Sequence, residues 1–199
     1  MESQRHAPRD RDLILDAARA CVLDVGLRRT TLADVARRAG VSRMTVYRQY
    51  GDLSAIVSAL LTSELLGLIE AAREEAASRL TARERLVGAA VLVVERLASH
   101  PLWCKVLDLD PELLLPLVVD RFGSTQRAAV DLVGAQIEQG QRDGSIRAGD
   151  PALLATCLLL TSQSFVFSAR VIAAQHKSEQ TGHELRRLLN GYLRNEDQR

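Results

Sequence analysis

The chain has 199 residues, of which 47% are hydrophobic, and a formal net charge of +1. A chain of this length and composition is able to bury a sizeable core, which excludes a disordered protein. The apolar runs at residues 113–119 and 153–160 are shorter than the roughly 20 residues of a membrane-spanning helix. Residues 1–12 are polar and contain no signal-peptide core. We therefore expect a cytoplasmic protein that makes no membrane contact.

The charge is divided unevenly along the chain. Residues 1–51 hold ten arginines and six acidic residues, a net charge of +4, whereas residues 52–199 carry −3. A basic head on a mildly acidic body is typical of a polyanion-binding module joined to a separate partner domain. The excess of arginine over lysine has an alternative origin in genomic base composition. We predict a domain boundary between residues 51 and 52.

Apolar residues recur three and four apart along nearly the whole chain, which predicts an all-α fold of about nine helices. The first helix spans residues 10–25 and ends at Gly26, a residue suited to a left-handed C-terminal cap. The second begins after Thr31, whose hydroxyl is able to cap it while Asp34 reaches back, and stops at Gly40. The third begins after Ser42.

The remaining helices are longer and more apolar. A fourth begins after Asp52, and a fifth spans residues 81–97 and ends before His100. A short element at 103–107 precedes a helix that Pro111 opens, that breaks at Gly123, and that resumes toward Gly140. The next is expected from Pro151 to about His176. The last carries one apolar stripe of Leu185, Leu188, Leu189, Tyr192 and Leu193.

Residues 31–50 carry the most specific pattern. Two short helices joined by a glycine-containing turn form the skeleton of a helix-turn-helix. The apolar positions would fix the angle between the helices and leave a polar row outside on the second one. In a DNA major groove, Arg43 or Arg48 is able to pair with guanine and Met44 to touch a thymine methyl group. Thr45 and Tyr47 suit phosphate oxygens, as do the amides that begin the helix at Thr31. The alternative is a solvated face of an ordinary helical protein.

The sequence TTLADVARRAGVSRMTVYRQYGD, at residues 30–52, resembles the helix-turn-helix of the TetR family of transcriptional regulators. The resemblance covers residues 12–57. It implies an N-terminal three-helix DNA-binding domain at 1–51, in which Tyr50 is the buried closing aromatic. It also implies a repressor that binds a palindromic operator in double-stranded DNA. The operator contacts that we expect from the pattern and the resemblance together are Thr31, Ser42, Arg43, Met44, Thr45, Tyr47 and Arg48.

Two details accompany this resemblance. Arg5, Arg9 and Arg11 are similar to a basic arm that would add phosphate contacts. Leu53 occupies a place where many relatives carry a lysine that approaches a phosphate, so one electrostatic contact is missing here.

For residues 52–199 the resemblance implies an effector-binding and dimerisation domain, with a homodimer formed through the last two helices. The segment 153–174 is apolar nearly all round, which independently predicts burial on several sides. We expect the effector to be a small, largely apolar molecule and the protein to need no cofactor and no metal. The residues predicted to contact the effector are Trp103, Phe122, Gln163 and Phe165.

Two other functions are alternatives to this one. An enzyme is disfavoured because no metal-ligand spacing, phosphate-binding loop or nucleophile motif accompanies His100, Cys104 and Asp108. A regulator of the same fold that responds to a protein partner instead of a small molecule remains open.

Overall fold

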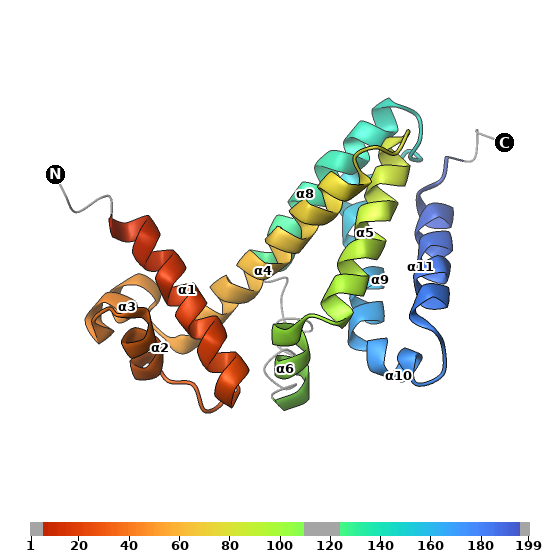
Figure 1. Ribbon diagram of the computed structural model, residues 1–199. Helices are drawn as coiled ribbons and strands as arrows, with labels where there is room; N and C mark the ends of the chain where they lie inside the picture. Colours follow the sequence, from red (N-terminus) through yellow and green to blue (C-terminus); the bar gives the residue numbers. More distant parts are fainter. Residues whose placement is uncertain (1–5, 110–123, 196–199) are drawn as a thin grey trace. The chain divides into compact units, whose positions relative to one another are not determined.

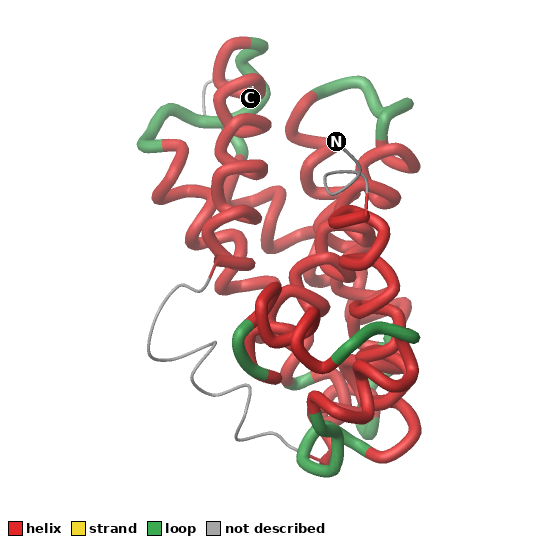
Figure 2. Tube along the Cα trace, turned by 90° about the vertical axis from the view of Figure 1, so that its left-hand side faces the viewer, coloured by secondary structure: helices red, strands yellow, loops and turns green. Residues whose placement is uncertain are grey.

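The computed structural model describes residues 6–109 and 124–195, which form ten helices and no extended strand (Figures 1 and 2). The all-α prediction is therefore confirmed. The first part of the helix predicted after Pro111, together with Arg5 and Phe122, lies outside the described residues, whereas the predicted continuation toward Gly140 is present as a helix over Ser124–Arg142. In chain order the helices are α1 (His6–Val25), α2 (Leu32–Ala39), α3 (Arg43–Tyr50), α4 (Leu53–Ala76), α5 (Ala82–Ala98), α6 (Pro101–Leu109), α8 (Ser124–Arg142), α9 (Pro151–Phe167), α10 (Ala169–Ala173) and α11 (Ser178–Leu193).

The helices form two compact units. The first consists of residues 1–64 and 101–122, and the second of residues 65–100 and 123–199. Helix α4 contributes its first half to the first unit and its second half to the second. The domain boundary predicted between residues 51 and 52 stays a prediction.

The core of the first unit is built by α1 to α4. Ile14, Val35, Val46 and Ile56 come from these four helices in turn, and each is fully buried. Helix α1 lies against both α2 and α6. An ion pair of 2.9 Å joins Arg19 of α1 to Glu64 of α4, which adds a polar link at the edge of this core.

In the second unit α5 lies against α8, α9 and α11, and α8 packs along α9 (Figure 1). The end of α4 packs against α5 through small side chains, since Ala72, Ala76 and Ala89 are buried together there. Small side chains there allow the two helix backbones to approach closely. Helix α11 covers α5 with one stripe of buried leucines: Leu185, Leu189 and Leu193.

Residues 143–147 form hydrogen bonds with two other parts of the second unit, the start of α5 and the end of α11. The Asp143 carboxylate accepts the backbone N–H of Ala82 at 3.1 Å and that of Ser145 at 2.9 Å, so it ties the start of α5 to the turn after α8. Arg147 donates its backbone N–H to Leu193 and its Nε to the Tyr192 carbonyl, at 2.9 Å and 2.8 Å. Its guanidinium also lies 4.9 Å from the centre of the Tyr192 ring. The end of α11 is thereby held by an ordered loop.

The prediction of one helix from Pro151 to about His176 is wrong in its second half. Helix α9 ends at Phe167, and the short α10 begins after Ser168. The Ser164 hydroxyl donates to the Thr161 carbonyl at 2.8 Å, and the Ser168 N–H bonds back to Ser164. Serine and threonine side chains compete for backbone groups in this way and weaken a helix end. An apolar segment without periodicity gave no signal for this break.

Helix α4 is a further departure from the sequence analysis. Its 24 residues, with a mean hydropathy of 1.6 over the most apolar window, are long and apolar enough to cross a membrane, whereas the runs considered above are too short. A core helix of a globular protein meets the same criterion. In this fold Ile56 and Leu60 of α4 are buried in the first unit and Ala72 and Ala76 in the second, and 28% of the apolar window is buried in all.

Candidate nucleic-acid interface

Local capping positions α2 and α3 as a helix-turn-helix. The Thr31 hydroxyl accepts the N–H of Asp34 at 3.2 Å at the start of α2, and Ser42 accepts that of Thr45 at 3.0 Å at the start of α3. Gly40 ends α2 with φ of +68°, in the left-handed region where a side chain would be strained. These three predicted signals are confirmed, and they fix the turn between the two helices.

The buried side of α3 is defined by Val46, which is fully buried, with the half-buried Tyr50 one turn later. Helical geometry places Met44 and Arg48 opposite Val46. Met44 is 70% exposed and Tyr47 59% exposed, so a thioether and a phenol ring lie on the outward surface of α3. An exposed thioether and phenol ring at the centre of a short polar helix indicate a surface that contacts another molecule.

Charge on this surface is available to a partner. Arg43 and Arg48 are exposed, and neither has an ion pair or hydrogen bond with any described residue. By contrast, Arg37 is paired with Asp34 at 2.7 Å and Arg38 with Asp24 at 2.6 Å. Among the arginines of α2 and α3, the two of α3 are therefore those whose guanidinium groups are unpaired with described residues, and guanidinium forks match both guanine edges and phosphates.

Hydroxyl groups at the helix starts are partly engaged. Ser42 and Thr45 share a hydrogen bond of 2.9 Å between their hydroxyls. The Thr31 hydroxyl donates to the Asp34 carboxylate at 2.6 Å. This hydrogen bond, together with the charge of Arg37, holds the pKa of Asp34 below its ordinary value although desolvation opposes it. A phosphate contact by the Thr31 hydroxyl would have to replace its bond to Asp34.

Residues around α3 complete the surface. Gln49 is exposed beside the predicted contacts and was missed, because its amide carries no charge and no motif singles it out. Tyr50 is half-buried, and burial raises the pKa of its phenol while the Arg11 guanidinium opposes this rise. Arg11 is exposed but belongs to α1, so it is part of a regular helix and not of an extended arm. Leu53 begins α4 half-buried, and Asp52 caps that helix through the N–H of Ala55 at 2.8 Å.

The residues predicted to contact an effector do not form one described site. Trp103 lies on α6 in the first unit, whereas Gln163 and Phe165 lie on α9 in the second. All three are half-buried. Two of their polar atoms, Trp103 Nε1 and Gln163 Oε1, are buried without a hydrogen-bond partner among the described residues. A buried polar atom without a partner is costly, which makes both atoms candidates for a bound group.

An exposed row of arginine, tyrosine and amide side chains on the second helix of a capped helix-turn-helix defines a class: helical proteins that bind duplex DNA through one short helix. Comparison with known proteins gives the family. The profile described as bacterial regulatory proteins, tetR family, matches residues 14–60. An uncharacterized HTH-type transcriptional regulator of Mycobacterium tuberculosis is 38% identical over 180 residues, which cover 90% of this chain and 92% of that protein. The chain belongs to the TetR family of transcriptional regulators, and it is a regulator and not an enzyme.

Solved structures of the same fold support this assignment. The transcriptional repressor QsdR from Rhodococcus erythropolis superposes with a TM-score of 0.71 at 18% identity, covering 94% of this chain and 97% of that one. FadR from Bacillus subtilis, solved in complex with stearoyl-CoA, gives a TM-score of 0.61 at 18% identity over 91% and 98%. At these identities the likeness concerns the fold alone.

Proposed function

We propose that the chain acts in the cytoplasm as a homodimeric repressor that binds a palindromic operator through α3 and is released by a small, largely apolar effector. The observation that carries the proposal is the pair of free guanidinium groups of Arg43 and Arg48 beside the exposed Met44 and Tyr47. In the proposed complex the arginines read guanine edges, Met44 contacts a thymine methyl group, and Tyr47 and Thr45 contact phosphates. Thr31 and Ser42 place two helix N-termini near the DNA backbone.

Exposed leucines support a homodimer. Leu153 and Leu160 are seven residues apart and so lie on one face of α9, where they are 59% and 46% exposed. Leu188 of the neighbouring α11 is 54% exposed. Large apolar side chains gathered on adjacent helices favour association with an identical face of a second copy. Two recognition helices related by a two-fold axis match a palindrome.

The nature of the effector rests on composition and on relatives. Helix α9 as a whole is mainly apolar, although Ser162 and Ser164 flank Gln163. The unpartnered Trp103 and Gln163 atoms offer a few polar contacts. FadR of Bacillus subtilis was solved with stearoyl-CoA, and the repressor AlkX of a Dietzia strain is implicated in biodegradation of n-alkanes. These properties favour an apolar effector, for which Trp103, Phe122, Gln163 and Phe165 remain the contacts proposed from the sequence.

Selection of bound sequences from a random duplex library tests the DNA-binding part. We expect the purified full chain to enrich a palindrome, and a double variant Arg43→Ala with Arg48→Ala to enrich nothing. Arg142→Ala is the charge-matched control, because Arg142 is exposed on α8 of the second unit. Enrichment of a palindrome by the double variant, or of an unsymmetrical site by the native chain, would contradict the proposal.

A further inference from the structure

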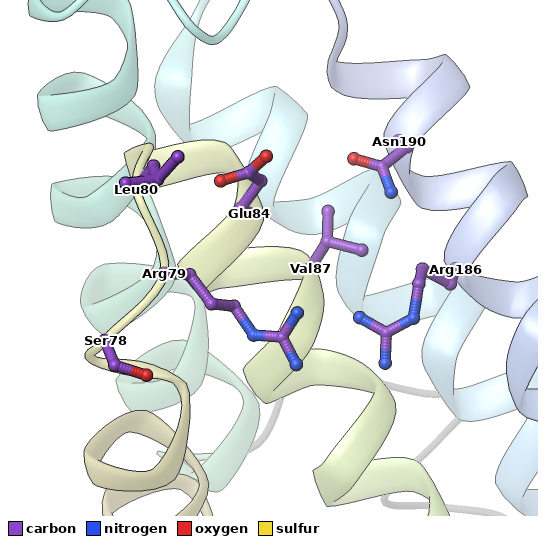
Figure 3. Close-up of a pocket in the computed structure, with 7 residues that line it drawn as sticks. All are labelled: Ser78, Arg79, Leu80, Glu84, Val87, Arg186 and Asn190. Carbon is purple, nitrogen blue, oxygen red and sulfur yellow. The ribbon is translucent and has the colours of Figure 1, made fainter.

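A cavity of about 390 Å³ lies in the second unit, and none of the residues that line it is predicted from the sequence to bind DNA or effector. It is formed where the connection between α4 and α5, the first turns of α5, and α11 meet (Figure 3). Its size falls within the range of small-molecule sites. The residues that line it are Ser78, Arg79, Leu80, Glu84, Val87, Arg186 and Asn190.

Two arginines from distant parts of the sequence converge on this cavity. Figure 3 shows the guanidinium groups of Arg79 and Arg186 pointing toward each other, with the Asn190 amide on the same side of α11. Neither guanidinium group has an ion pair or hydrogen bond with a described residue, although the Arg79 carbonyl accepts a hydrogen bond from Arg85 at 3.1 Å. Two like charges that face each other repel. An anion bound between them would attract both and offset this repulsion.

Gly88 explains why Arg79 lies in the cavity. Gly88 is buried in α5, and a Cβ at this position would lie 2.5 Å from Arg79 Nε and 2.9 Å from its Cζ. Because glycine has no side chain, the Arg79 guanidinium is able to lie directly against α5. A side chain at position 88 would therefore require the Arg79 side chain to move.

The other walls limit what the cavity can hold. Val87 is 1% exposed and forms an apolar wall, whereas Leu80 is 91% exposed at the rim. Glu84 is the one acidic residue among those lining the cavity, and its carboxylate already accepts the Thr81 N–H at 3.2 Å in the cap of α5. The lining residues thus carry one net positive charge and offer fork-shaped donors, a combination suited to a planar or tetrahedral oxyanion.

We propose that this cavity binds the phosphate or carboxylate group of a small metabolite, held by Arg79, Arg186 and Asn190, with a short apolar portion of the ligand against Val87. The site is separate from the operator surface and from the effector contacts proposed above. A ligand there would link the connection before α5 to α11 and stabilise the second unit by mass action.

Thermal unfolding of the full chain tests the proposal with four probes, namely inorganic phosphate, pyrophosphate, acetate and octanoate, each against chloride at equal ionic strength. We expect at least one probe to raise Tm saturably. A response to phosphate and pyrophosphate alone would assign a phosphate group, and a response to acetate or octanoate alone a carboxylate. Arg79→Gln and Arg186→Gln should each weaken the apparent affinity about tenfold, the loss of a charge-assisted hydrogen bond.

Three controls separate this site from other sources of binding. Arg187→Gln removes the same charge from the adjacent residue of α11, which is exposed and pairs with Glu184 at 3.6 Å, and it should leave the affinity unchanged. Arg43→Ala should also leave it unchanged, which excludes anion binding at the DNA surface. Gly88→Ala keeps both charges and should weaken binding by displacing Arg79. Because Arg79 is exposed, the Arg79→Gln variant keeps the core intact. Its affinity for the probe therefore tests the proposal even if Arg186→Gln fails to fold.

The proposal is overturned if no probe gives a saturable response. It is equally overturned if Arg79→Gln binds as the native chain does, or if Arg187→Gln loses as much affinity as Arg186→Gln.

Discussion

Leu188 and Leu189 are consecutive in α11 but have different environments, since Leu189 is 1% exposed and Leu188 is 54% exposed. Successive side chains of a helix differ by about 100° in direction, so one leucine packs into the second unit while its neighbour points outward. The stripe expected from the sequence combined both residues. Dimer formation therefore has to be tested with a substitution at Leu188 alone, because a charge at Leu189 would disrupt the fold itself.

Leu188→Glu should therefore produce a folded monomer. The carboxylate would be desolvated in the proposed apolar interface, which disfavours association strongly, whereas the free subunit keeps that side chain in water. Sedimentation velocity should show loss of the dimer, and circular dichroism should show unchanged helix content. A dimer that persists in this variant would place the interface elsewhere. In the contrasting variant Leu189→Ala, the free energy of unfolding should fall by about 2–5 kcal/mol, because a buried cavity is created.

Arg43→Ala and Tyr47→Phe should have different effects on DNA binding. If Arg43 reads a guanine, its loss costs about 1–3 kcal/mol on the operator and little on random duplex. If the Tyr47 hydroxyl serves a phosphate, Tyr47→Phe weakens binding to both duplexes alike. Dissociation constants for operator and random duplex at one fixed salt concentration measure the difference. Equal losses for both variants on both duplexes would disprove this division of roles, and Arg142→Ala should change neither constant.

Asp143 makes the stability of the second unit depend on pH. Burial alone would raise its pKa, but hydrogen bonds from Ser145 and Ala82 and the charge of Arg85 outweigh this and lower it. A depressed pKa in the folded state means that the stabilisation is complete above the unfolded value, near 3.8, and is lost as pH falls through the folded value. Urea unfolding should give Asp143→Asn a deficit of about 1 kcal/mol at neutral pH, typical of a lost cap, which shrinks below pH of about 4. A deficit independent of pH would contradict this account. Asp131→Asn, at an exposed acid of α8, is the control.

Trp103 offers a direct signal for the proposed effector. It is the one tryptophan of the chain, and its buried Nε1–H has no hydrogen-bond partner among the described residues. A ligand that contacts the ring or supplies an acceptor should change its emission, and operator release should follow the same titration. Octanoate and stearoyl-CoA are suitable first probes, and Phe165→Ala should weaken both responses. A probe that releases DNA without changing Trp103 emission, and that still acts on Phe165→Ala, would place its site elsewhere.

Local signals in the sequence predicted the architecture well. The helix starts after Thr31, Ser42 and Asp52 lie where the pattern placed them, because a cap depends on a few neighbouring residues. Helix α9 likewise begins at Pro151 as predicted. The outward-facing residues of α3 could be predicted because helical geometry places them on the side opposite the buried Val46. The break at Ser168 was missed, since an apolar segment without a polar face has no period to interrupt.

The sequence alone did not indicate which distant residues lie close together in the folded chain. Arg79 and Arg186 have no common motif, and the glycine that seats Arg79 lies on a third segment, so the cavity became visible only in the folded chain. The separation of Leu188 from Leu189 likewise depends on which side of α11 meets α5.

Helix α11 closes the second unit from the far end of the described chain, since its buried leucines cover α5 and its end is held by Arg147. Translation delivers α1 to α3 first and α11 last, so the unit cannot finish folding while α11 is still within the ribosome. A polypeptide that terminates before Ser178 would carry a DNA-reading head but would lack both the cover of α5 and the leucine proposed to join two copies. Such a fragment would present one recognition helix to a two-sided operator and would be a poor competitor for it. A protease or stop codon that removes α11 would then abolish the proposed repression without changing the DNA-binding surface.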